Sequence, residues 1–182
     1  MATTNHQIAT RIKAATGVDI DMCYQCGKCT AGCVLADEMD YPSSMIMRML
    51  QTNDEENYHK IISSEAIWLC LNCENCIGRC PKEVDIPKVM DYLRADSVKN
   101  KCVSPKAKPI LSFYQSFLGT VKTSGRLSEV FMTIRFKLRT LRLWQDVNLV
   151  PSMLAKGKLK FIPESIKGKR NLKNIFKSTN NK

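Results

Sequence analysis

Eight of the nine cysteines lie in two copies of one pattern, Cys-x2-Cys-x2-Cys-x3-Cys, that begin 47 positions apart. The first run consists of Cys23, Cys26, Cys29 and Cys33, and the second of Cys70, Cys73, Cys76 and Cys80. The first residues show no basic segment followed by an apolar core, so we expect no signal peptide and a cytoplasmic protein. Cysteines at this density in that compartment favour metal binding over disulfides.

The spacing within each run is the ligand pattern of bacterial two-cluster ferredoxins. In those proteins each run gives three thiolates to one [4Fe–4S] cluster and its fourth thiolate to the other. The pattern therefore predicts a first cluster bound by Cys23, Cys26, Cys29 and Cys80, and a second bound by Cys70, Cys73, Cys76 and Cys33. Structural zinc is the alternative, but zinc ribbons usually separate two Cys-x2-Cys pairs by roughly 15–20 residues. Two [4Fe–4S] clusters, and hence electron transfer, are the expectation.

The two runs differ in their neighbours. Pro81 follows the second run, whereas Val34 takes that place after the first. We expect Gly27, Gly32 and Gly78 to let backbone N–H groups approach the sulfurs, and such hydrogen bonds tune reduction potentials. The inequality of the runs would help the two clusters to differ in potential.

The apolar pattern predicts a mainly α-helical chain. Gly17 is expected to end a first helix, and Pro42 to open one over Ser43–Gln51. Another helix is expected over about Glu55–Ile62, and Pro87 opens a further one. Alternating apolar and polar stretches and hairpin turns such as Asn-Gly are absent from the sequence, so β-structure is not expected.

Charge divides the chain near residue 100. Residues 1–98 carry 9 Lys and Arg against 14 Asp and Glu, whereas residues 99–182 carry 19 against 3. We therefore expect a cluster-binding domain over residues 1–100 and a basic helical region over residues 101–182, with a linker at 101–109. Cys102 has no partner run and is expected to be a lone thiol.

The basic region is expected to contain a helix that ends near Gly125 and a second helix with Phe131, Ile134 and Leu138 facing inward. Its basic residues are interpreted either as a solvated helix face or as a docking surface for partner subunits with acidic surfaces. Nucleic acid and membrane binding are disfavoured because aromatic stacking platforms at regular spacing are missing. No apolar run is long enough to cross a bilayer.

Beyond the cysteines, 36 residues separate Cys33 from Cys70 and are predicted to be helical, unlike the short β-rich spacers of ordinary ferredoxins. This arrangement resembles the α-helical ferredoxin fold. Several segments are similar to those of the C subunits of soluble, methanogen-type heterodisulfide reductases. They are CYQCGKCTAGC at 23–33, YPSSMIMRML at 41–50, WLCLNCENCIGRCPKEVDIPKVMDYLR at 68–94, SGRLSEV at 124–130 and AKGKLKFIPESIKG at 155–168.

The resemblance implies an electron-relay protein without catalytic residues of its own. Electrons would pass from the A subunit, which contains flavin and clusters, through this chain to the B subunit, which reduces the coenzyme M–coenzyme B heterodisulfide of methanogenesis. A hydrogenase or formate dehydrogenase would supply them. The alternatives are a C-type relay component of a related sulfur-metabolism or other respiratory oxidoreductase and, disfavoured by the spacing, a zinc-stabilised module that binds nucleic acid.

Overall fold

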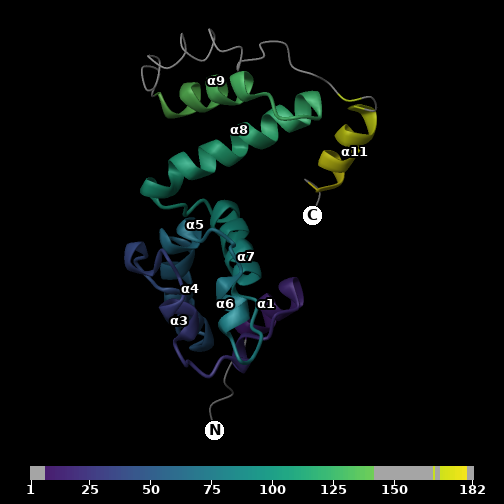
Figure 1. Ribbon diagram of the computed structural model, residues 1–182. Helices are drawn as coiled ribbons and strands as arrows, with labels where there is room; N and C mark the ends of the chain where they lie inside the picture. Colours follow the sequence, from purple (N-terminus) through teal and green to yellow (C-terminus); the bar gives the residue numbers. More distant parts are fainter. Residues whose placement is uncertain (1–6, 142–165, 167–168, 180–182) are drawn as a thin grey trace. The chain divides into compact units, whose positions relative to one another are not determined.

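The computed structural model describes residues 7–141, 166 and 169–179. These residues form helices and no β-strand (Figure 1), so the predicted mainly α fold is confirmed. The chain divides into two compact units, Met1–Ala107 (unit 1) and Lys108–Lys182 (unit 2).

Among the described residues, no helix combines the length and the apolar character that spanning a membrane requires.

Unit 1 consists of short helices joined by tight turns. The helices are α1 (Gln7–Thr16), α2 (Lys28–Ala31), α3 (Ser43–Gln51), α4 (Glu55–Ile62), α5 (Ala66–Leu69), α6 (Asn75–Arg79) and α7 (Ile86–Lys99). Single 3₁₀ turns cover Ile20–Met22, Ala36–Glu38 and Pro105–Ala107. The bounds of α3 and α4 are those expected from the sequence.

The ends of these helices have local causes. Gly17 adopts a left-handed conformation with φ of 75°, which ends α1 as predicted. The Asp54 carboxylate accepts hydrogen bonds from two backbone N–H groups in the first turn of α4. Asp85 does the same for the Lys88 N–H in α7, whose first turn also contains Pro87. These caps define where the short helices begin and end, and they thereby set the lengths of the loops between them.

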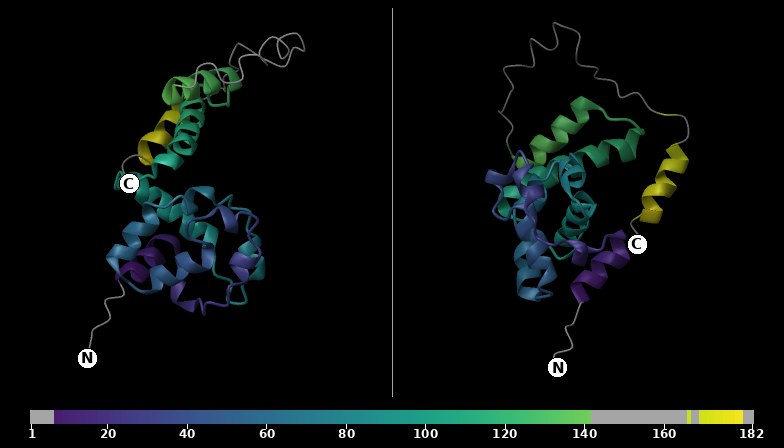
Figure 2. Two further views of the ribbon diagram at one scale, coloured as in Figure 1. Left: turned by 90° about the vertical axis from the view of Figure 1, so that its left-hand side faces the viewer. Right: turned by 60° about the horizontal axis from the view of Figure 1, so that its bottom comes forward.

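The apolar faces of the helices meet in one core. Its fully buried side chains are Ile8, Ile12, Ile20, Ile46, Met47, Leu50, Ile61, Ile67, Val89, Met90 and Leu93. Helix α7 packs against α1, α4 and α5, and α3 packs against α1, α2 and α4 (Figure 2). The Asp40 carboxylate adds a polar tie, because it accepts hydrogen bonds from the backbone N–H groups of Glu65 (3.0 Å) and Ala66 (2.8 Å). The core thus forms a rigid support beneath both cysteine runs.

Unit 2 contains α8 (Lys108–Ser124), α9 (Glu129–Thr140) and α11 (Lys169–Thr179), and α8 packs against the other two. The predicted linker at 101–109 is wrong at its last two residues, because α8 begins at Lys108. Pro109 is compatible with this start, since the first turn of a helix needs no backbone N–H donor there. Helix α8 ends before Gly125, whose φ of 81° is left-handed, as expected.

The expected inward face of α9 is also wrong. Phe131, Ile134 and Leu138 are 49%, 50% and 60% exposed. The buried residues of α8 are small, namely Ser116, Thr120 and Ser124. Between the two helices, Phe113 of α8 and Phe136 of α9 meet edge to face with ring centroids 6.0 Å apart, so a different side of α9 from the predicted one contacts α8.

Candidate metal centre

The two cysteine runs share left-handed residues at two equivalent positions as well as the same spacing. The residue two positions after the first cysteine is left-handed in both runs, with φ of 63° at Gln25 and 51° at Asn72. The residue two positions further on is also left-handed, with φ of 75° at Gly27 and 63° at Glu74. A short helix then begins in each run. Left-handed non-glycine residues are costly and cluster at functional sites, so this repeat marks both loops as candidate sites.

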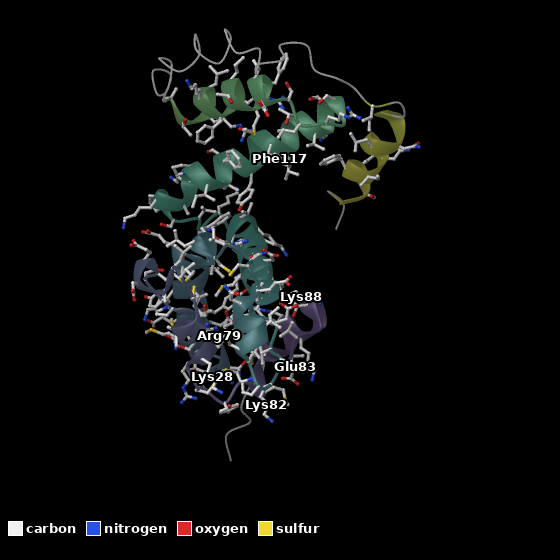
Figure 3. The ribbon with its side chains drawn as sticks, viewed as in Figure 1. Lys28, Arg79, Lys82, Glu83, Lys88 and Phe117 are labelled. Atoms are coloured by element: carbon white, nitrogen blue, oxygen red, sulfur yellow. The ribbon has the colours of Figure 1, made fainter. Side chains whose placement is uncertain are left out.

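The runs lie against one another through α2 and α6. Gly32 permits this approach, because a Cβ atom there would lie 2.3 Å from Cδ of Arg79. The side chain of Arg79, labelled in Figure 3, therefore covers the backbone of the first run. This close approach is what makes ligands shared between the runs possible.

Four cysteines from both runs line one cavity. They are Cys33, Cys70, Cys73 and Cys76, here called the second cysteine group. Apolar side chains form much of the remaining wall, among them Val34, Leu35, Met39 and Leu71. The cavity thus combines three cysteines of the second run with the distal cysteine of the first, the combination that the spacing predicts.

The other four cysteines, Cys23, Cys26, Cys29 and Cys80, are called the first cysteine group. Tyr24 lies among them, and the pKa of its phenol is raised chiefly because its hydroxyl donates a hydrogen bond to Cys26. The charges that Cys26, Cys80 and Cys23 carry as thiolates raise it further, so Cys80 lies near the first run. A hydrogen bond from the Lys28 backbone N–H lowers the pKa of the Cys26 thiol. This contact, directly after left-handed Gly27, is of the kind expected from the glycines.

Burial separates the inner from the outer thiols. Desolvation raises the pKa of Cys29 and raises that of Cys76 to about 11, and a neighbouring Cys29 charge contributes at Cys76. The two cysteine groups are therefore close enough to interact. Cys26 and Cys73 are exposed, so each group also reaches the surface.

The donor set fits iron–sulfur clusters. Thiolates are the protein ligands that [4Fe–4S] clusters take, four for each cluster, and the two groups supply four each. In the part of the chain that the structure describes, no three His, Cys, Asp or Glu side chains converge closely enough to hold a single metal ion. The thiols of the second cysteine group instead line a cavity. Binding a cluster there would displace the protons of half-buried thiols such as Cys76.

Each cysteine loop is held by a side chain from the helix that follows it. Gln51 Nε2 donates hydrogen bonds to the carbonyl oxygens of Ile20 (2.9 Å) and Cys23 (2.7 Å). Arg94 donates to the carbonyl oxygens of Ile67 and Cys70, which lie 47 positions further along. The two loops are therefore anchored at equivalent atoms, one by a neutral amide and the other by a guanidinium.

A second layer of contacts supports the Arg94 anchor. Arg94 pairs with Asp91 at 2.9 Å, and the Asp91 carboxylate accepts hydrogen bonds from Asn72 Nδ2 at 2.9 Å. Asn72 is one of the left-handed residues of the second loop. Sequence reasoning missed Gln51, Arg94 and Tyr24, since a glutamine, arginine or tyrosine in a helical chain carries no signal of such a contact.

Cys102 lies apart from both groups. Its half-buried Sγ lies 3.8 Å from the carbonyl oxygen of Ile62 and 3.6 Å from that of Ser97.

Comparison with known proteins agrees with this geometry. Residues 19–84, which contain all eight cysteines of the two runs, match the family of 4Fe-4S dicluster domains. The chain is homologous to C subunits of heterodisulfide reductases. It is 33% identical over 107 residues to the C subunit of the H(2):CoB-CoM heterodisulfide,ferredoxin reductase of Methanothermobacter thermautotrophicus, covering 59% of this chain and 56% of that protein.

Further relatives carry the same kind of name. The iron-sulfur C subunit of the CoB--CoM heterodisulfide reductase of Methanopyrus kandleri is 35% identical over 78 residues, which cover 43% of this chain and 38% of that protein. The C subunit of the ferredoxin:CoB-CoM heterodisulfide reductase of Methanosarcina acetivorans is 34% identical over 83 residues, or 46% and 32%. The chain thus spans only part of the length of these curated relatives, from 32% to 56%.

Proposed function

We propose that this chain is the electron relay of a heterodisulfide reductase and carries two [4Fe–4S] clusters. The observation that carries the proposal is the cavity lined by Cys33 together with Cys70, Cys73 and Cys76. Homology to C subunits of heterodisulfide reductases supports the same role. A pair of clusters in one rigid unit is suited to moving single electrons.

The ligands are proposed to cross between the runs. The first cluster takes the first cysteine group and the second cluster takes the second cysteine group. Support for the first comes from Tyr24, which lies near Cys23, Cys26 and Cys80 at once. When bound, the clusters supply one-electron chemistry.

The other residues of the site position the thiolates. Gln51 and Arg94 hold the carbonyl oxygens at the start of each loop, which fixes where the first cysteine of each run begins. The Lys28 N–H and the Tyr24 hydroxyl donate hydrogen bonds to Cys26, and such bonds stabilise negative charge on a cluster sulfur. We assign no catalytic residue to the chain.

Partners follow from the relay role. We propose that the chain receives electrons from the flavin-containing A subunit and passes them to the B subunit, which reduces the coenzyme M–coenzyme B heterodisulfide in the cytoplasm of a methanogen. A hydrogenase or formate dehydrogenase would act upstream. The basic region at 101–182 is proposed to dock these other subunits, and the exposed apolar side chains of α8 and α9 support this role. These include Phe117, labelled in Figure 3, and Phe131.

Chemical analysis tests the proposal. The chain, purified without oxygen, should contain about eight iron atoms and about eight acid-labile sulfides. Mixed with the reduced A subunit it should become reduced, and the B subunit with heterodisulfide should reoxidise it. Zinc without sulfide would overturn the proposal.

A further inference from the structure

Exposed cations surround the ligands of the first cysteine group. Lys28 stands between Cys26 and Cys29, Arg79 directly precedes Cys80, and Lys82 follows Cys80 by two positions. All three basic side chains are exposed. Figure 3 shows Lys28, Arg79 and Lys82 at the same end of unit 1, with Glu83 as an acidic neighbour.

The charge of these cations is opposite in sign to the net charge of residues 1–98. Residues 1–98 contain 14 acidic against 9 basic residues. Several other basic side chains of unit 1 are in ion pairs, such as Lys13 with Asp19 at 2.6 Å and Lys60 with Glu56 at 2.7 Å. Among the described residues, Lys28, Arg79 and Lys82 form no ion pair. Their charge is therefore available to an outside partner.

An exposed aromatic ring lies with them. Tyr24 is 56% exposed and directly follows Cys23 of the first cysteine group. Tyrosine and arginine are enriched where proteins bind one another, because they combine a large contact area with a polar tip. We call Tyr24, Lys28, Arg79 and Lys82 the basic rim.

The edge of the second cysteine group has a different chemistry. Val34, next to Cys33, is 76% exposed, and Leu71, next to Cys70, is 68% exposed. A relay must meet a donor and an acceptor, and these two edges would select different partners. Of these two edges, the basic rim is the one whose charge can attract an oppositely charged partner.

We propose that the basic rim docks an acidic protein surface whose redox centre exchanges one electron with the first cluster. This inference rests on the proposed function. The partner loses or gains one electron, the cluster gains or loses it, and no bond or proton transfer is needed. Complementary charge raises the rate of encounter and makes it fall with added salt.

The test uses the full, cluster-loaded chain. The probe is a chemically reduced acidic [2Fe–2S] ferredoxin, and stopped-flow absorbance follows reduction of the chain at low and high salt. The double variant K28E/K82E reverses two charges of the rim. The matched control K60E/K99E makes the same change of net charge on α4 and at the last residue of α7, where Lys60 and Lys99 are also exposed.

At low salt the rim variant should react with the ferredoxin about tenfold more slowly or worse than the unmodified chain, and the salt dependence should shrink. The control should stay within about twofold. A basic c-type cytochrome, which takes electrons from the reduced chain, should react faster with the rim variant. Equal effects of the rim and control variants would overturn the basic rim as a docking surface.

Cluster content separates this failure from a failure of the proposed function. Iron, sulfide and EPR signals should be the same in the unmodified chain and in both double variants. Absence of clusters from the unmodified chain would overturn the proposed function and the docking proposal together. Intact clusters with rim-independent rates would overturn the docking proposal alone.

Discussion

Replacing Arg94 by methionine should weaken the second cysteine loop and leave the first largely intact. The Arg94 side chain is only 14% exposed, donates to the carbonyl oxygens of Ile67 and Cys70, and pairs with Asp91. Methionine keeps much of the length and the packing but removes the charge and every donor. Both carbonyl oxygens then lose the donor that holds them.

The size of the effect follows from these contacts. A hydrogen bond from a charged group contributes about 1.5–3 kcal/mol, so two contribute at least about 3 kcal/mol. The pair with Asp91, which is 57% exposed, adds less than about 1 kcal/mol. Gln51→Met provides the matched comparison in the first loop, where three neutral hydrogen bonds are lost at about 1 kcal/mol each, one of them accepted by Gln51 Oε1 from Gln25 Nε2. R94M should therefore cost more free energy of unfolding than Q51M.

Anaerobic denaturant unfolding measures the two costs, and EPR of the reduced proteins shows which cluster is affected. R94M should lose or alter the signal of the cluster bound by the second cysteine group, and Q51M that of the first. An R94M protein with unchanged unfolding and two unchanged clusters would refute the anchoring role of Arg94.

Three further changes have defined outcomes. Gly32→Ala should lower the unfolding midpoint, because the new methyl group pushes the Arg79 side chain aside. Adding Arg79→Ala should recover much of this loss. If the effects of the two substitutions were simply additive, the contact between residues 32 and 79 would be contradicted. Tyr58→Phe should cost about 1.5–3 kcal/mol at neutral pH by removing the 2.6 Å hydrogen bond to the Asp96 carboxylate. Burial raises the pKa of the Tyr58 hydroxyl above that of an unfolded tyrosine, which is about 10. The hydroxyl therefore stabilises the fold fully below about pH 10, and this stabilisation is lost as the pH rises further. Unfolding measured at about pH 7 and above about pH 10 should show this loss of stability in the unmodified protein and not in Y58F. Cys102→Ser should keep the full iron and sulfide content, and loss of iron would give Cys102 a role in cluster binding.

Local signals made much of unit 1 predictable. The helices Ser43–Gln51 and Glu55–Ile62 have their expected bounds because Pro42 and Asp54 define their starts within a few residues. Gly17 ended the first helix for an equally local reason, its left-handed backbone. The cysteine spacing likewise acts over eleven residues, which is why it predicts the ligand type.

Contacts between distant residues were not predictable in this way. Arg94 reaches Cys70 across 24 positions and Gln51 reaches Cys23 across 28, and neither distance leaves a pattern in the sequence. The left-handed Asn72 and Glu74 are not glycines, so turn chemistry alone did not indicate them. The prediction that Phe131 faces inward failed because helical periodicity identifies an apolar face without identifying what covers it.

Crossed ligation of two clusters is the central claim, and EPR of four single variants tests it most directly. Cys26→Ser and Cys73→Ser define the spectrum of a protein with its first or its second cluster damaged. Cys80→Ser should then match Cys26→Ser, and Cys33→Ser should match Cys73→Ser. A Cys80→Ser spectrum that matched Cys73→Ser would contradict the account, because each run would then hold its own cluster.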